Sequence, residues 1–477
     1  MKNNRKPFLA TIFNEDTLVN AFRLSAVTAS VGVYAGYLIS NSGAFGIVDL
    51  LAAGASLALF IATVFFGMPA FVAAIFGKKD ELAPLYDDQP SAGERKRGFI
   101  AVVLFALSFH VISGVIGFLI FAAFNRSGAA GSDGFLGLLE RAWMKIDTDA
   151  EHYVNIAENW YVTEGESRVL IVFFPMLPIL MRALNCVIHN SFVSAEIINA
   201  AATSLACGML YLTFLPVLGK KRALYAPFVA LLLPGAVFFN SPMTEPLFLL
   251  FTVCSFYFIQ NKKFLLAGLF AALAGFTRSL GVLLVVPIAF EGIRNVVALK
   301  KAGEKWKQQL LVLALALGIS CIGTAGYLYI NYAVTGKWTK FMEYQWSKWH
   351  QSLSPFYDTP RYTAGGLLAA IDRGDFASAL SFWGPNLAMI FASQIIILKR
   401  QSKLPSWYTL YFLVYFAFSI GCSWLLSGVR YLSVAVPLIA AIALVMDEKR
   451  SRIRAFAILT VLYLAFMLMY MLWLGIY

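Results

Sequence analysis

The chain has 477 residues, of which 60% are hydrophobic and 13% are charged. A soluble protein of this length cannot bury so large an apolar fraction, so the composition excludes a soluble enzyme and a disordered chain. The net charge of +12 would suit a nucleic-acid binder, but basic residues also gather in the cytoplasmic loops of membrane proteins. Together, the composition and charge predict a multi-pass membrane protein.

Apolar runs long enough to form membrane helices recur along the whole chain. The first is too long for a signal-peptide core and lacks a clear small-residue cleavage site, so we expect a retained helix. We predict an all-α polytopic membrane protein with about 13 spans, or about 11 if segments between 246 and 292 are re-entrant, because a span needs about 20 apolar residues. The predicted spans are 18–40, 46–77, 98–124, 194–218, 223–240, 246–260, 264–277, 279–292, 308–332, 379–398, 405–425, 431–446 and 455–475.

Lys and Arg cluster at alternate connections between the predicted spans. Because such clusters mark cytoplasmic loops, their alternation places the N-terminus in the cytoplasm and the C-terminus outside. The segments 125–193 and 333–378 are then long outer loops. The basic clusters lie at 78–79, 219–222, 261–263, 399–403 and 447–454.

Both outer loops carry apolar stripes at helical spacing. In the first loop, Tyr153, Ile156 and Trp160 belong to such a stripe, which predicts short helices lying on the membrane surface. The second loop has a similar face, made of Trp338, Phe341, Met342, Gln345, Trp346 and Trp349. A charged linker at 78–97 indicates two domains: an N-terminal two-helix membrane unit with its linker, 1–97, and a catalytic membrane domain, 98–477.

The first outer loop also contains an acidic cluster, Asp147-Thr148-Asp149-Ala150-Glu151-His152-Tyr153. Charged groups near membrane depth are costly and are therefore functional candidates. An Asp at the start of a surface helix could act as general base for an acceptor hydroxyl. Alternatively, Asp149 only caps the helix, which is the commoner role for this spacing. The pair Asp147 and Asp149 also suggests a divalent metal, although one pair supplies few ligands.

Two further clusters fall at the outer face. One is a broken apolar segment, Phe173-Phe174-Pro175-Met176-Leu177-Pro178, followed by Arg182. The other is the tight turn 240–246, which ends in Glu245 and Pro246. Glu245 either caps the following helix, which is the simpler interpretation, or binds a sugar hydroxyl.

Two arginines complete the outer candidates. Arg278 and Arg430 each lie at an outer helix end, and Tyr431 follows Arg430. A guanidinium there could bind a phosphate through several N–H donors. The alternative is that each arginine reaches out to lipid headgroups. Two arginines at the face that also carries an acidic cluster favour the phosphate.

Other chemistries lack support in the sequence. His110 falls inside a span as a core residue, and the five cysteines show no metal-ligand spacing, so no zinc site is predicted. Neither a P-loop nor a G-x-G-x-x-G motif occurs, and a cytosolic nucleotide site is therefore unsupported.

The four outer clusters, taken in order, resemble a family. Residues 98–446 resemble the multi-spanning GT-C glycosyltransferases, and most of all the GPI mannosyltransferase II group with its prokaryotic relatives. The motifs that carry the resemblance are Asp149 to Ala157, 173–178, Ser241 to Glu245, Arg278 to Gly281, and Arg430-Tyr431 with Pro437. Thr148 stands where the family has Trp, which leaves open whether Asp147 or Asp149 is the family aspartate. The spacing to Tyr153 favours Asp149.

The resemblance implies an inverting transferase that moves a hexose, with mannose as first expectation, from a polyprenyl-phosphate sugar to an acceptor hydroxyl. Asp149 or Asp147 would be the base, and the leaving phosphate would bind Arg430, Arg278 and Tyr431. His152, Tyr153 and Glu245 would bind substrate. The acceptor, whether glycan, lipid or protein, is left open, as is a divalent metal; no other cofactor is implied. We expect a prokaryotic plasma membrane, with the active site extracytoplasmic and no nucleic-acid partner.

Two other functions fit part of the pattern. A lipid-linked sugar flippase or transporter would be a polytopic membrane protein too, but no internal repeat is evident and the charged candidates gather at one face instead of the midplane. A polysaccharide ligase of the O-antigen type would share the lipid-linked donor and outer arginines. The early acidic loop favours the first function.

Overall fold

The structure is a computed structural model, and it describes residues 15–41, 43, 45–76, 85–86, 88–124, 134–145, 148–423 and 427–476. Within these ranges every regular element is a helix, and Leu353 and Cys422 form an isolated β-bridge. The predicted all-α class is therefore confirmed.

The helices follow one another in two halves of the chain. The first half of the chain forms α2 (Glu15–Ser40), α3 (Ile47–Ile75), α4 (Ala92–Phe124), α5 (Gly134–Trp143), α6 (Asp149–Asn159), η1 (Glu166–Val172), α7 (Met176–Ile188), α8 (Ser191–Leu232), η2 (Pro234–Asn240) and α9 (Glu245–Gln260). The second half forms α10 (Phe264–Thr277), η3 (Ser279–Leu284), α11 (Val285–Lys301), α12 (Trp306–Thr335), α13 (Lys340–Trp349), α14 (Asp358–Asp372), α15 (Phe376–Ser378), η4 (Ala379–Trp383), α16 (Gly384–Arg400), η5 (Gln401–Lys403), α17 (Ser406–Ile420), α18 (Gly428–Ser433), α19 (Val436–Ala443), η6 (Leu444–Met446) and α20 (Lys449–Met471).

Among the described residues, eight helical stretches are long and apolar enough to cross a membrane, or up to ten if two sharply bent pairs each count as one span. The protein is therefore a multi-pass membrane protein, while the predicted count of about 13 is not confirmed. One reason is α8, which joins the two spans predicted at 194–218 and 223–240. Its helical geometry breaks at Gly219, where φ is 77°. The count of eight takes the two helices on either side of Gly219 as one stretch, although the break falls at the basic junction that the sequence predicts between two spans.

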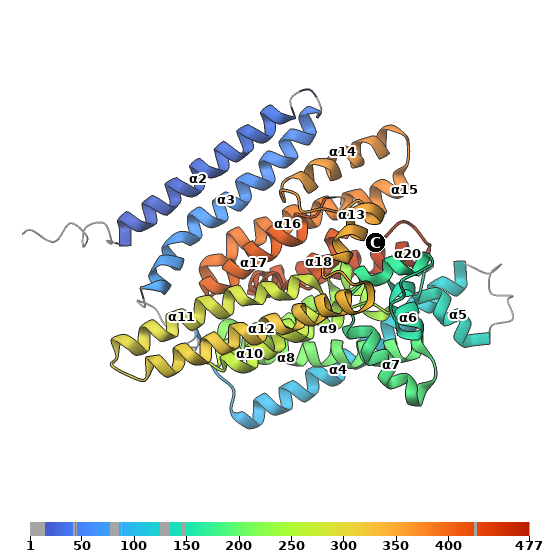
Figure 1. Cartoon of the computed structure of the whole chain (residues 1–477), viewed down its shortest axis with the longest axis horizontal. Coiled ribbons are helices and arrows are strands. Elements are labelled where there is room, and N and C mark those ends of the chain that lie inside the picture. Colours follow the sequence, from blue (N-terminus) through green and yellow to red (C-terminus); the bar gives the residue numbers. More distant parts are fainter. Residues whose placement is uncertain are drawn as a thin grey trace, which may run out of the picture.

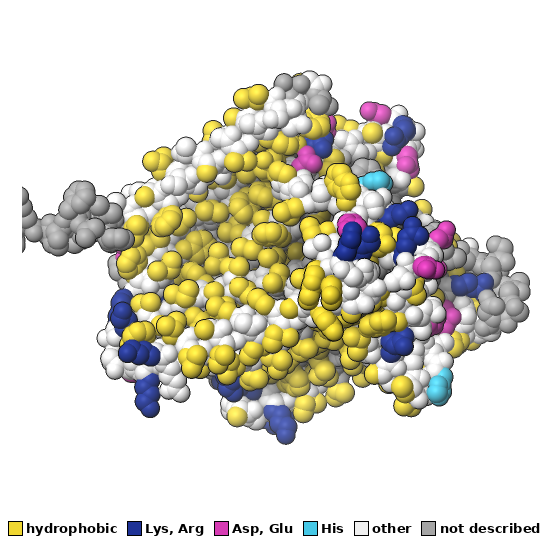
Figure 2. Space-filling view, viewed as in Figure 1, with side chains coloured by type: hydrophobic (Ala, Val, Ile, Leu, Met, Phe, Trp, Pro, Cys, Tyr) yellow, Lys and Arg dark blue, Asp and Glu magenta, His cyan; other side chains and the backbone are white. Residues whose placement is uncertain are grey.

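The long helices run side by side, so the bundle has two ends (Figure 1). We call the end that carries α5, α6 and α7 the site end, and the end that carries the α11–α12 turn the far end. Between them the visible face is largely hydrophobic, as Figure 2 shows. Lys and Arg gather on this face at the far end, whereas both charge signs occur at the site end. This distribution is that of a bundle crossing a bilayer.

The surface helices predicted in the outer loops are present. In the first loop α5 buries Ala142 and Trp143 while Phe135 is exposed. In the second loop α13 has no buried residue, and its Met342 and Trp346 side chains are exposed. Exposed aromatic and Met side chains on a short helix suit a membrane–water interface.

The N-terminal hairpin of α2 and α3 packs against the rest of the bundle. Within the apolar layer, Ser56 Oγ donates to Gln394 Oε1 at 3.0 Å, and Gln394 Nε2 donates back to the Ser56 carbonyl at 2.8 Å. Near the end of α2, Tyr37 donates a hydrogen bond to Asp358 of α14. The division into a unit 1–97 and a domain 98–477 stays a prediction, and α4 already begins at Ala92 instead of residue 98.

Helices α10 and α12 approach so closely that only glycine fits between them. A Cβ at Gly323 would lie 1.8 Å from the carbonyl oxygen of Ala272, and one at Gly268 would lie 2.4 Å from that of Ala316. Small residues allow such backbone approach between membrane helices. Because α10 ends immediately before Arg278, this contact fixes the position of that arginine.

We expect Gly323→Ala to destabilise the protein by about 1–3 kcal/mol, the usual cost of overpacking, because the added methyl group would push α10 and α12 apart. Thermal unfolding in detergent measures the effect. Gly318→Ala is the matched control on α12, since a Cβ there meets nothing within 4 Å. That control is expected to be neutral or slightly stabilising, because alanine favours a helix over glycine. Equal melting temperatures for both variants would contradict the close contact.

Candidate active site

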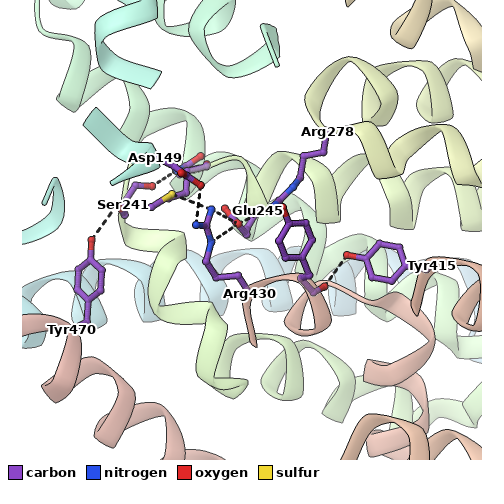
Figure 3. A network of polar contacts seen from close by, with 10 residues as sticks. Asp149, Ser241, Glu245, Arg278, Tyr415, Arg430 and Tyr470 are labelled. Atoms are coloured by element: carbon purple, nitrogen blue, oxygen red, sulfur yellow. Dashed lines mark hydrogen bonds and ion pairs between the residues drawn. The ribbon is translucent and has the colours of Figure 1, made fainter. Parts of the chain in front are cut away.

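Four segments that lie far apart in sequence converge at the site end of the bundle (Figure 3). They are the first turn of α6, the start of α9, the residue after α10, and the short helix α18. Each contributes one charged side chain, namely Asp149, Glu245, Arg278 and Arg430. We call these four residues the charge cluster.

Arg430 lies at the centre of the charge cluster. Its Nη1 donates to Asp149 Oδ2 at 2.9 Å, and its Nε donates to Glu245 Oε1 at 2.9 Å. Its Nη2 lies 2.8 Å from the same Glu245 oxygen and 3.3 Å from the Met243 sulfur. Only 4% of the Arg430 side chain is exposed. A buried guanidinium is tolerated because two carboxylates compensate its charge.

Arg278 binds the same carboxylate from the other side. Its Nη1 donates to Glu245 Oε1 at 2.6 Å, and its guanidinium lies 4.4 Å from the centroid of the Tyr431 ring. Glu245 is fully buried, and all these bonds go to Oε1. Among the described residues, Oε2 of Glu245 has no hydrogen-bond partner. Most buried carboxylate oxygens have a hydrogen-bond partner, so this oxygen is an exception within the charge cluster.

Local structure positions the two acids. Thr148, with extended backbone, precedes α6, so Asp149 occupies the first helical position, where a negative charge is stabilised by the helix dipole. Asp149 is the accessible member of the charge cluster, with 37% of its side chain exposed. Glu245 begins α9, and the turn before it is held by Asn199 of α8, which donates to the carbonyl groups of Ser241 and Met243.

The remaining predicted residues surround the charge cluster. Tyr431 lies under Arg278, and its carbonyl accepts a hydrogen bond from Tyr415 at 2.7 Å. Tyr153 is buried in α6, and this burial, together with the nearby Asp149 charge, raises its pKa above the ordinary value. Its hydroxyl therefore stays protonated and can donate. His152 packs instead against the Phe173 ring, at 5.0 Å between centroids, and no described contact joins it to the charge cluster.

Asp147, the alternative base, lies outside the described residues. Of the pair Asp147 and Asp149, only Asp149 has contacts that the structure describes. Within the described ranges, no three His, Cys, Asp or Glu side chains gather in a way that would hold a metal ion. The D-x-D suggestion of a divalent cation therefore stays a prediction.

The broken segment 173–178 holds α6 in place. Phe173 contacts the rings of His152, Tyr153 and Trp349, which lies at the end of α13. Arg182 of α7 donates to the carbonyl of Ala157 at 2.8 Å near the end of α6. The contact between Phe173 and Trp349 joins the segments 125–193 and 333–378.

Sequence reasoning missed the hydrogen bonds beside the charge cluster. Ser241 Oγ donates to the Trp143 carbonyl at 2.7 Å, and Tyr470 of α20 donates to the same carbonyl at 3.0 Å. The Tyr470 hydroxyl also lies 3.4 Å from Ser241 Oγ. Ser241 stood in a motif that the sequence had singled out. Tyr470 stands in an ordinary apolar span, and nothing in that pattern distinguishes it.

A buried lysine also adjoins this network. Lys145, between α5 and α6, is 5% exposed, and its ammonium lies 4.1 Å from the centroid of the Tyr470 ring. Burial lowers the pKa of Lys145 from 10.5 to about 7. In the folded protein, the side chain therefore loses its proton more readily than in the unfolded chain.

We expect Lys145→Met to stabilise the protein at pH 7, and this gain to shrink as the pH rises toward 10. Between pH 7 and 10.5 the unfolded chain retains a proton that the folded protein has released, so wild-type stability rises with pH in this window. Melting temperatures from pH 6 to 10 measure the effect. The control is Lys348→Met on the exposed face of α13. A difference between wild type and Lys145→Met that is constant across this range would contradict the expectation.

Comparison with known proteins locates one segment of the chain in a family. Residues 174–328, about a third of the 477 residues, match the model of the family described as dolichyl-phosphate-mannose-protein mannosyltransferase. The chain is thus similar to mannosyltransferases of the GT-C type over this segment. Glu245 and Arg278 lie within it, whereas Asp149 and Arg430 lie outside. The narrower resemblance to GPI mannosyltransferase II is not confirmed, and no curated protein matches the chain.

Two solved structures illustrate the structural comparison. ArnT from Cupriavidus metallidurans, bound to undecaprenyl phosphate, is 14% identical with a TM-score of 0.44, covering 76% of this chain and 62% of that one. The oligosaccharyltransferase from Archaeoglobus fulgidus, tethered with an acceptor peptide, is 13% identical with a TM-score of 0.40, covering 76% and 55%. The chain therefore spans less than two thirds of the length of either protein.

Proposed function

We propose that this protein is a GT-C-type membrane glycosyltransferase that moves a hexose from a polyprenyl-phosphate sugar to an acceptor hydroxyl, with inversion. Mannose is the first candidate sugar, in line with the family match. The observation that carries the proposal is the partly exposed Asp149 carboxylate in direct contact with the buried Arg430 guanidinium. A base for the acceptor and a cation for the leaving phosphate are the two groups that this reaction needs.

The charge balance of the cluster couples these two groups. Two carboxylates and two guanidiniums compensate one another, and Arg430 Nη1 is engaged by Asp149 before reaction. When Asp149 takes the hydroxyl proton, the acceptor oxygen bonds to the anomeric carbon from the face opposite the phosphate. The carbon–oxygen bond to the phosphate breaks with its electron pair. Neutral Asp149 no longer holds Arg430, whose N–H group turns to the phosphate as its negative charge increases.

The other predicted residues have roles that suit their positions. Arg278, stacked on Tyr431 and bonded to Glu245, supplies a second cation for the phosphate. Oε2 of Glu245, for which the described residues offer no hydrogen-bond partner, accepts a hydroxyl of the hexose. Tyr153, beside Asp149, lies on the substrate side of α6. The surface helices α6 and α13 cover the site and restrict water, which limits hydrolysis of the donor.

The sidedness is part of the proposal. The basic far end faces the cytoplasm, and the site end faces outward, in a prokaryotic plasma membrane. Nucleotide sugars are scarce outside the cytoplasm, so a donor carried by a membrane lipid is the chemically suitable one.

Donor turnover tests the function. Purified protein in liposomes receives a panel of polyprenyl-phosphate hexoses with a membrane lipid extract, and mass spectrometry follows donor loss and hexose-bearing products. We expect one donor to be consumed by the wild-type protein and not by Asp149→Asn. If neither protein consumes any donor, donor binding is compared between wild type and Arg430→Ala. Donors that wild type neither consumes nor binds would overturn the proposal in favour of a flippase.

A further inference from the structure

A second polar site lies at the far end of the bundle. It is a pocket of about 250 Å³ between the break in α8, the segment before α4 and the first turn of α20. Its charged lining residues are Asp88, Lys221, Arg222, Asp447 and Arg452, with Tyr86 and Tyr225 as aromatic walls. None of these residues takes part in the proposed transfer reaction.

Its two acids are already engaged. Asp447 forms an ion pair with Arg222, whose guanidinium lies over the Tyr86 ring at 4.9 Å from its centroid. Asp88 accepts a hydrogen bond from the backbone amide of Lys220, at the position where α8 breaks. Asp447 is therefore paired with Arg222, whereas Asp88 keeps its charge but forms no described ion pair with the other two cations of the lining.

Those two cations are Lys221 and Arg452. Among the residues that the structure describes, Lys221 forms no ion pair. Arg452 donates to the neutral hydroxyl of Tyr225 at 3.0 Å and lies over that ring. Two cations without carboxylate partners, at the rim of one pocket, constitute a site for an anion.

The surroundings strengthen the positive potential. Helix α20 follows Glu448 at its N-cap and carries Lys449, Arg450, Arg452 and Arg454 in its first two turns. Cations therefore outnumber this acid near a helix N-terminus, where the helix dipole disfavours positive charge. An anion bound in the pocket would relieve both the dipole and the mutual repulsion of these side chains.

We propose that this pocket binds the phosphate of an anionic phospholipid headgroup from the adjacent leaflet. The pocket adjoins the break in α8 and the polar start of α20, two helical stretches long and apolar enough to span the membrane, so a lipid can place its phosphate there while its acyl chains stay in the bilayer. Basic pockets between membrane helices bind acidic headgroups by this arrangement. The inference is independent of the transferase activity.

Lipid retention tests the pocket. The protein is reconstituted with phosphatidylglycerol or with phosphatidylcholine of the same acyl chains, extracted in mild detergent, and examined by native mass spectrometry. The pocket variant is Lys221→Gln with Arg452→Gln. The matched control, Lys449→Gln with Arg450→Gln, removes the same charge from exposed positions that do not line the pocket. If the double variant does not fold, the single variant Lys221→Gln replaces it, because Lys221 is exposed.

We expect wild type and control to retain phosphatidylglycerol over phosphatidylcholine, and the pocket variant to bind it about 30-fold more weakly, as the loss of two cations predicts. The single variant is expected to show about a fivefold loss. An equal loss in the pocket variant and the control would overturn the proposal, since it indicates diffuse surface charge. A separate arm adds inorganic phosphate without lipid. Saturable binding there at micromolar concentration, with no preference between lipids, would assign the pocket to free phosphate instead.

Discussion

Replacing Asp149 with Asn is expected to lower sugar transfer by about 10²- to 10⁴-fold at saturating donor, which is the contribution of a general base. Asparagine keeps the size of the side chain, and its amide oxygen can still accept the hydrogen bond from Arg430 Nη1. The fold and donor binding should therefore be retained, while proton removal from the acceptor is lost. The initial rate of product formation in liposomes, together with the melting temperature, measures both effects.

The matched control for this prediction is Glu151→Gln, which removes a carboxylate from the same first turn of α6. We expect its transfer rate to stay within about threefold of wild type, as for a surface substitution away from the reacting groups. An Asp149→Asn protein with the activity of Glu151→Gln would exclude Asp149 as the base. Asp147 would then be the remaining candidate for the base.

The sequence predicted that certain charged residues would share one end of the molecule, and the structure places four of them in contact. The reason is physical: charges near membrane depth must be paired. The pairing itself was beyond the sequence, because Arg430 and Asp149 are separated by 281 positions. Nor could residue spacing indicate that both arginines would bind a single oxygen of Glu245. The roles of these residues stay predictions.

Backbone contacts were the least predictable part of the site. Ser241 and Tyr470 both bind the carbonyl of Trp143, and a carbonyl group is present at every residue whatever its side chain.

The start of α4 could have been predicted more exactly from the sequence. Ser91 and Glu94 form a reciprocal capping box, with Ser91 N donating to Glu94 Oε2 and Glu94 N donating to Ser91 Oγ. The sequence contains this serine–glutamate spacing, so a search for caps as well as apolar runs would have found the helix start.

Removal of the Glu245 carboxylate should have the largest effect on stability. Glu245→Ala leaves Arg278 and Arg430 buried, with the exposed Asp149 as the remaining acid of the charge cluster. Breaking a buried ion pair by deleting one partner costs about 3–5 kcal/mol, because the other charge stays uncompensated. Unfolding in detergent, followed by temperature or denaturant, measures this loss. The control is Glu343→Gln on α13, whose ion pairs with Lys337 and Lys340 are on the surface and contribute about 0–1 kcal/mol.

A second variant separates the lost pairing from the lost side-chain volume. In Glu245→Ala with Arg278→Ala, one of the two uncompensated guanidiniums is removed along with the carboxylate. We expect this double variant to be less destabilised than the sum of the two single variants, by about 1–3 kcal/mol of coupling. Strictly additive effects would mean that Arg278 and Glu245 do not stabilise each other. The position of Arg278 would then depend on its other contacts, such as the Tyr431 ring, and not on its ion pair with Glu245.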